Sequence, residues 1–176
     1  MRKQRSDKRS ALKLIELCMT VVIIIGSLIV FRSETFAAPS EYDRIMLEKI
    51  NEYRKTNGIP ALEYNKDLAR VADLRVGELT VSFSHFRPNG DSYKTAYTEL
   101  GIADKFDRGS ENIARVLDNW DFEKGTAEEY VDYIFEAYKR SESHNANMLK
   151  PYWTYYGGSF LTNYNGNCYQ IQVFAN

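Results

Sequence analysis

The chain has 176 residues, of which 44% are hydrophobic and 27% are charged, and its formal net charge is −1. Beyond Ala37 there are 21 acidic residues against 16 basic ones, dispersed along the chain, which argues against a nucleic-acid-binding surface. The apolar content excludes a disordered chain, and the roughly 140 residues after the N-terminal segment are enough for a single domain with one core.

The N-terminal segment has the order of a secretory signal: basic residues, then the uncharged run 17–31, then small residues at Ala37 and Ala38. The run has 15 residues, fewer than the roughly 20 that a membrane-spanning helix needs. We therefore expect residues 1–38 to be a signal peptide cleaved after Ala37 or Ala38; the alternative is an uncleaved anchor with its positive end inside. Both interpretations place the remaining domain, residues 39–176, outside the cytoplasmic membrane, and only the anchor would lie in the membrane.

The first predicted helix of the domain is marked by side chains that recur on one helical face: Tyr42, Ile45, Met46, Lys49, Ile50 and Tyr53. Ser40 with Asp43 resembles a capping box, and Asn57-Gly58 supplies a left-handed exit. This pattern predicts a helix from about Tyr42 to about Lys55.

A second helical face follows after Asn65, which is a predicted N-cap: Leu68, Val71, Ala72, Arg75, Val76 and Leu79. Gly77 lies inside this helix and weakens it by up to ~1 kcal/mol relative to alanine. We expect a close packing contact to explain the glycine.

Both histidines of the chain are predicted near helix ends. The Pro-Asn-Gly turn makes residues 84–90 a loop, which places His85 after the second helix, and a short helix is expected at about 93–100. Thr126 and Glu129 form a capping box for a longer helix that ends near Arg140, and His144 follows its exit.

The C-terminal part changes to the period of a β-strand. Residues 155–162 and 168–175 are predicted to pair as a hairpin, in which Asn165-Gly166 favours a type I′ turn, and there is room for one more strand at about 113–117. Together these elements predict an α+β domain in which helices pack on a small sheet. Signal cleavage would leave Cys168 as the only cysteine, so no internal disulfide is expected, and its strand pattern indicates a small buried hydrophobe.

In chain order, six segments resemble the CAP superfamily of cysteine-rich secretory, antigen 5 and pathogenesis-related proteins: INEYR (50–54), LEYN (62–65), FSHFRPNG (83–90), ENIA (111–114), SESHNANML (141–149) and YQIQVFA (169–175). The similarity is to the short, disulfide-free bacterial branch. It implies an α-β-α sandwich with a small central antiparallel sheet flanked by helices.

The resemblance also implies a cleft lined by two histidines and two acidic residues, which in several members hold a divalent metal such as zinc. His85, Glu111 and His144 match three of these positions, whereas Ser141 stands at the rim of the cleft where a second Glu is usual. Two imidazoles and one carboxylate would be sufficient for a zinc site with an open position, with Glu111 as a ligand or as a candidate catalytic base. The alternative is that His85 and Glu111 form a hydrogen bond that organises the loops, without metal or reaction.

Other polar and aromatic residues are interpreted as structural. Ser84 and Ser141 lie near the histidines but lack the context of an activated nucleophile. The aromatic residues at 152–156 are expected in the core or at its rim. Asn147, Gln170 and Gln172 are expected to form structural hydrogen bonds.

Three functions follow as hypotheses. The first is a secreted, non-enzymatic binding module for an extracellular lipid, cell-envelope component or protein, with an optional metal. The second is a metal-assisted hydrolase such as an endopeptidase. The third is a structural role at the cell surface or in spore formation. A fold alone does not decide among them.

Overall fold

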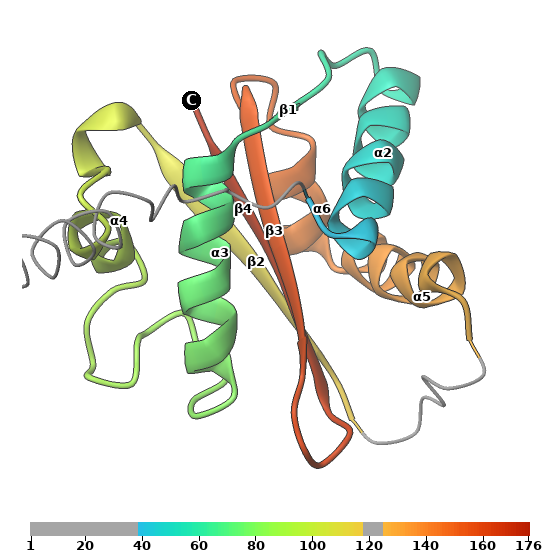
Figure 1. Ribbon diagram of the computed structural model, residues 1–176. Helices are drawn as coiled ribbons and strands as arrows, with labels where there is room; N and C mark the ends of the chain where they lie inside the picture. The colour runs from blue at the N-terminus through green and yellow to red at the C-terminus, as the bar shows by residue number, and fades with distance from the viewer. Residues whose placement is uncertain (1–38, 118–124) are drawn as a thin grey trace, which may run out of the picture. The chain divides into compact units, whose positions relative to one another are not determined.

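The computed structural model describes residues 39–117 and 125–176, and the predicted signal segment, residues 1–38, lies outside the described part. In chain order the elements are α2 (Glu41–Thr56), β1 (Glu63–Tyr64), α3 (Lys66–Leu79), α4 (Thr95–Glu99), the 3-10 helix η1 (Ala103–Lys105), β2 (Gly109–Val116), α5 (Ala127–Arg140), α6 (Glu142–Met148), β3 (Tyr155–Thr162) and β4 (Cys168–Ala175) (Figure 1). Within the described ranges, no helix has the length and apolar character needed to cross a membrane.

A four-stranded sheet in the order β1-β3-β4-β2 lies at the centre of the domain. β4 pairs antiparallel with both β2 and β3, as expected, whereas β1 pairs parallel with β3, so the sheet is mixed. The sheet divides the expected single core in two: one hydrophobic cluster packs α3 and α4 on one face, and a second packs α2, α5 and α6 on the other (Figure 1). The α+β fold with a helix-covered sheet is thereby confirmed.

The three long helices begin at the predicted caps. The Ser40 hydroxyl accepts a hydrogen bond from the Asp43 N–H at 3.1 Å and donates one to the Asp43 carboxylate at 2.8 Å. Asn65 caps α3 through the N–H of Leu68, at 3.2 Å, and of the residue before it, and Thr126 opens α5 with a complete capping box. These local signals fixed the helix starts because each one satisfies N–H groups that the helix itself leaves unpaired.

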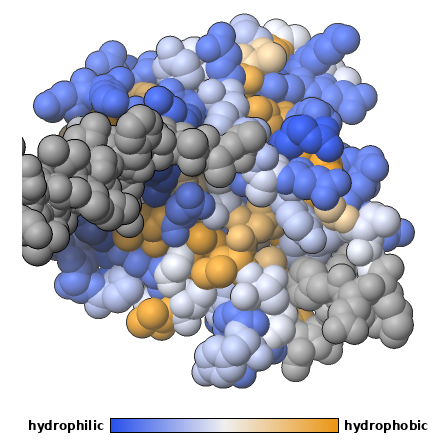
Figure 2. All heavy atoms as spheres, viewed as in Figure 1, coloured by the Kyte–Doolittle hydropathy of each residue, from blue (hydrophilic) through white to orange (hydrophobic). Residues whose placement is uncertain are grey.

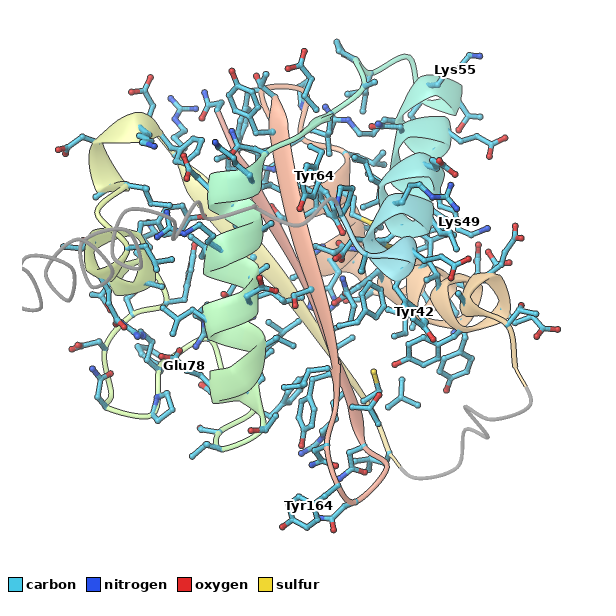
Figure 3. All side chains as sticks on the ribbon, viewed as in Figure 1. Tyr42, Lys49, Lys55, Tyr64, Glu78 and Tyr164 are labelled. Carbon is cyan, nitrogen blue, oxygen red and sulfur yellow. The ribbon has the colours of Figure 1, made fainter. Side chains whose placement is uncertain are left out.

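The structure differs from the sequence-based expectations at α6 and at the hairpin turn. α6 was not predicted, because its seven residues carry no apolar period and include Ser143, Asn145 and Asn147, which are poor helix formers. The type I′ turn is also wrong. Of the hairpin residues only Gly166 has a positive φ, of 76°, and its N–H donates to the Asn163 carbonyl at 3.0 Å, while the Asn163 N–H donates to Asn167 at 2.9 Å. A four-residue turn followed by a glycine bulge therefore joins β3 to β4, and Tyr164 projects from its tip (Figure 3).

The expected packing contact at Gly77 is wrong as well. A Cβ placed on Gly77 would meet no atom within 4 Å, whereas one on Gly157 of β3 would collide with the α3 backbone at Leu68 and Ala69. The glycine that lets α3 approach the sheet closely is therefore in the strand and not in the helix.

Gly77→Ala should raise the free energy of unfolding by about 0.5–1 kcal/mol, because alanine restricts the unfolded chain and fits the helix without a clash. Urea denaturation of the two proteins measures the difference. Gly157→Ala is the matched control and should destabilise the domain strongly. A destabilised Gly77→Ala variant would show that the site is more crowded than the structure indicates.

Two interpretations of the core are confirmed. Cys168 is 2% exposed and unpaired, and burial raises the pKa of its thiol. Among the C-terminal aromatic residues, Trp153 and Tyr156 are buried in the core, whereas Tyr152 is 41% exposed at its rim.

Candidate functional site

The structure places the predicted site residues on three different elements. His85 lies in the loop between α3 and α4, Glu111 lies in β2, and His144 lies in α6. The loop that carries His85 folds back on itself, since the Arg87 N–H donates to the Asp91 carbonyl at 2.8 Å. Ser141 lies between α5 and α6.

Glu111 and His85 are in direct contact. The Nδ1 atom of His85 lies 2.9 Å from Oε1 of Glu111. The same carboxylate receives two hydrogen bonds from the Arg75 guanidinium, from Nε to Oε2 at 3.1 Å and from Nη2 to Oε1 at 2.9 Å. The Arg75 side chain is 0% exposed and the Glu111 side chain 1%, whereas the His85 side chain is 51% exposed. An exposed imidazole thus rests on a buried ion pair.

Arg75 is the site residue that the sequence analysis missed. It also donates to Glu78 at 2.7 Å and to the Ser84 carbonyl at 2.9 Å. Glu78 in turn pairs with Arg87 at 2.6 Å, and Arg87 pairs with Glu99 at 2.6 Å. The available signal was an arginine on the buried face of α3, because a charge in that position requires a partner of opposite charge.

Hydrogen bonds on the other face of β2 hold the helix that carries His144. Asn112 follows Glu111, so its side chain points to the opposite face of the sheet. The Asn112 amide donates to the His144 carbonyl at 3.1 Å and to Gln172 at 2.9 Å, and it accepts from Asn147 at 3.0 Å. Two adjacent residues of one strand thereby position both histidine-bearing segments, and the structural role expected for Asn147 and Gln172 is confirmed.

The His144 ring packs edge-on against Tyr138, with 5.1 Å between the ring centroids. Burial lowers the pKa of His144, and a charge on His85 lowers it further. The two imidazoles therefore lie within electrostatic reach of each other. Tyr138 itself is buried and donates to the Gln170 side chain at 2.6 Å, as expected for a structural role of Gln170.

The two serines near the histidines make local contacts only. The Ser84 hydroxyl accepts from the Phe86 N–H at 3.0 Å, and the Ser141 hydroxyl lies 3.4 Å from that of Ser143. Across the described residues, neither hydroxyl is hydrogen-bonded to a histidine, so nothing in the geometry activates them as nucleophiles.

The arrangement of the donor groups does not by itself form a site for a divalent metal. The described ranges contain no group of three or more His, Cys, Asp and Glu residues arranged to hold a metal ion. Both oxygens of Glu111 accept hydrogen bonds from Arg75, and one of them also contacts His85. A cation at this site would therefore have to rely on the imidazoles of His85 and His144.

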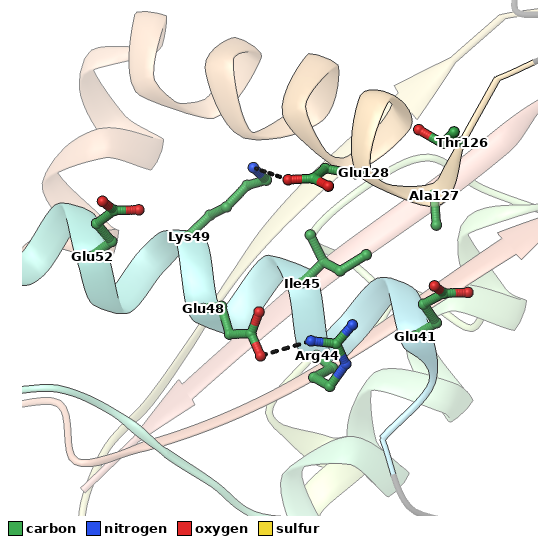
Figure 4. Close-up of a pocket in the computed structure, with 9 residues that line it drawn as sticks. All are labelled: Glu41, Arg44, Ile45, Glu48, Lys49, Glu52, Thr126, Ala127 and Glu128. Carbon is green, nitrogen blue, oxygen red and sulfur yellow. Dashed lines mark hydrogen bonds and ion pairs between the residues drawn. The ribbon is translucent and has the colours of Figure 1, made fainter.

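Two hollows lie away from this site. One, of about 450 Å³, lies between α2 and the start of α5, where Lys49 reaches toward Glu128 (Figure 4). The other, of about 200 Å³, is lined by residues of α4, η1 and the start of β2, among them Tyr97 and Phe106. Neither hollow includes His85, Glu111 or His144.

Comparisons with known proteins agree with this architecture. Residues 47–174 match the model of the cysteine-rich secretory protein family, CAP. A search of curated proteins found no match.

Three solved structures illustrate the similarity of fold. The chain is similar to an outer surface protein from Borrelia burgdorferi, with a TM-score of 0.64 and 18% identity over 80% of this chain and 96% of that one. An extracellular protein with an SCP domain from Bacillus anthracis gives a TM-score of 0.60 and 18% identity, over 78% of this chain but only 41% of that one. NaASP2, solved with Zn²⁺, gives a TM-score of 0.52 and 12% identity over 78% and 83%.

Proposed function

The chain belongs to the CAP family of cysteine-rich secretory proteins, and we propose that it is an exported member whose domain binds an extracellular ligand at the His85 site without catalysing a reaction. The ligand classes that suit such a domain are a lipid, a cell-envelope component or a protein. Nucleic acid is not among them, because the domain carries a dispersed negative charge.

The main support for this proposal is the burial of Glu111 and its pairing with Arg75. A general base or metal ligand needs a free lone pair that reaches the reacting group. The Glu111 side chain is 1% exposed and receives two hydrogen bonds from Arg75. It is the anchor of His85, and this supports binding over hydrolysis. The hydrolase alternative would require Glu111 to leave Arg75, so any turnover by the protein that disappears in Glu111→Ala would contradict our proposal.

The surface around His85 suits a ligand with an apolar part. Three large hydrophobic side chains flank the histidine in sequence and are exposed, Val81 by 77%, Phe83 by 39% and Phe86 by 63%. The face seen in Figure 2 is largely hydrophilic, with apolar side chains near its middle. Exposed apolar groups beside a polar anchor are a common feature of binding surfaces.

A divalent metal is an optional part of the proposal, suggested by NaASP2, which was solved with Zn²⁺. Here His85 and His144 would hold the ion, and zinc would act as a Lewis acid for a ligand oxygen. We expect calorimetric titration with Zn²⁺ to show binding that weakens by about tenfold or more in both His85→Ala and His144→Ala.

Ser141→Ala is the control for this titration and should bind zinc as the wild type does. Equal binding by the wild type and both histidine variants would remove the metal from the site. A purely structural role at the cell surface or in spores would be favoured if the histidine variants also left every ligand interaction of the native protein unchanged.

Export is proposed from the N-terminal segment, and the Borrelia and Bacillus proteins of similar fold are described as outer-surface and extracellular. Mass spectrometry of the protein recovered from culture medium should find Ala38 or Pro39 as the first residue. Protein that retains Met1 and stays in the membrane fraction would show the anchor instead.

A further inference from the structure

A single guanidinium holds His85 from two sides. Arg75 Nη2 donates to the carbonyl of Ser84, the residue directly before His85, at 2.9 Å. The same group fixes the carboxylate of Glu111, which contacts the His85 ring at Nδ1. Arg75 therefore restrains both the backbone and the ring of a side chain that is itself 51% exposed.

The chemistry of this contact determines where the imidazole carries its proton. A carboxylate bound to an arginine is an acceptor only, so the hydrogen bond to His85 requires a proton on Nδ1. In the neutral ring the other nitrogen, Nε2, then has a free lone pair. An unrestrained histidine prefers the opposite tautomer, with its proton on Nε2, so the contact reverses an intrinsic preference.

We propose that Arg75 is a positioning residue that acts through Glu111 to keep neutral His85 protonated at Nδ1, so that Nε2 is a hydrogen-bond acceptor for the ligand. To the neutral ring the ligand then presents a donor, a hydroxyl or an N–H group. This ligand class rests on the proposed function, whereas the tautomer does not.

Nitrogen NMR of the ¹⁵N-labelled protein tests the tautomer directly, because the two imidazole nitrogens differ strongly in shift when only one is protonated. The chain contains 2 histidines, and His144→Gln assigns the signals of the other. At a pH where the ring is neutral we expect the Nδ1–H form of His85 to dominate. A ring protonated mainly on Nε2 would overturn the proposal without any variant.

The role of Arg75 is tested by the double variant Arg75→Met/Glu111→Leu. It removes both charges together, because a single change would leave the other charge buried and alone. We expect the tautomer ratio of His85 to shift toward Nε2–H. Persistence of the wild-type ratio in a folded double variant would show that the ion pair does not set it.

Arg87→Met is the matched control. Arg87 lies in the same loop and pairs with Glu78 and Glu99, and within the described residues its guanidinium makes no hydrogen bond to His85 or Glu111. The substitution should lower stability and leave the tautomer unchanged, and an equal change in both variants would reduce Arg75 to a general structural role.

Inorganic phosphate tests the ligand class. Because the neutral ring offers a lone pair and no proton at Nε2, phosphate should leave the His85 nitrogen shifts unchanged at a pH where the ring is neutral. A saturable phosphate-induced shift would overturn the assignment of a donor ligand while leaving the tautomer result intact. Failure of the proposed ligand function and failure of the positioning role are thus separate outcomes.

Discussion

Arg54→Met should lower the free energy of unfolding by about 4 kcal/mol or more, which is at the upper end of what single substitutions do. Arg54 is 0% exposed, and its guanidinium has four backbone carbonyls as its hydrogen-bond acceptors. Nε donates to Pro60 at 2.7 Å, Nη1 to Met148 at 2.8 Å and Lys150 at 3.0 Å, and Nη2 to Trp153 at 3.2 Å. Methionine would remove all four hydrogen bonds, and the carbonyls of Met148 and Trp153, whose bonds to Arg54 are buried, would lose this donor.

The substitution should also disturb the position of His144, because Arg54 connects α2 to the last residue of α6, the helix that carries this histidine. Urea denaturation gives the loss of stability. Arg54→Lys should lose less stability than Arg54→Met but should not reach the wild-type value. One ammonium group cannot reach all the acceptors that a planar guanidinium reaches together. Arg44→Met on the same helix is the control and should change stability by less than about 0.5 kcal/mol, because its pair with Glu48 is exposed. A loss at Arg54 no larger than at Arg44 would contradict the argument.

The elements that could be predicted from the sequence are those whose signals are local. Ser40, Asn65 and Thr126 satisfy N–H groups of their own helices, and the two strands of the hairpin lie directly before and after the Asn-Gly turn signal. β1 was missed because a strand of two residues has no period and exists only through its pairing with β3. The turn type was missed because Asn165-Gly166 permits several hairpin turns and the strand register selects one.

In the candidate site too, some residues could be predicted from local motifs and one could not. His85, Glu111 and His144 were predicted from motifs, and the structure adds how they are held. Arg75 was hidden because its position in the apolar face of α3 indicates burial but does not identify its partner, Glu111, which lies far along the chain. The consequence is functional, since the carboxylate that the motif offers as a ligand or base has its oxygens engaged by Arg75.

The second large effect is expected at Asp43, a buried carboxylate away from the His85 site. Asp43 is 6% exposed, and burial raises its pKa from 3.8 to about 6, an effect that the nearby Asp73 increases and the hydrogen bond from Ser40 opposes. Its Oδ1 atom and the buried hydroxyl of Tyr156 both lack a hydrogen-bond partner in the described part of the chain. A Cβ on Gly158 would contact both atoms, so both lie beside this glycine.

The sign of the pH dependence follows from the raised pKa. The folded protein binds this proton more tightly than the unfolded chain, so the stabilisation is present below the unfolded pKa of 3.8 and is lost as pH rises through about 6. A shift of about two units corresponds to about 3 kcal/mol. The neighbouring ionisable groups from the packed elements, Asp73 of α3, Tyr64 of β1 and Tyr156 of β3, supply no positive charge to offset it.

Asp43→Asn should therefore be more stable than the wild type at pH 7.5, by up to about 3 kcal/mol, and the advantage should nearly vanish at pH 4. Asparagine keeps the shape and can accept from Ser40, but it brings no charge into the core. Urea unfolding of both proteins at the two pH values measures the change, and Glu48→Gln, an exposed carboxyl on the same helix, should show no such dependence. A stability difference independent of pH would mean that Asp43 is ionised in the folded protein without penalty. The residual charge would then have to be compensated by a donor to Oδ1, and a buried water between Asp43 and Tyr156 is the group of suitable size and chemistry.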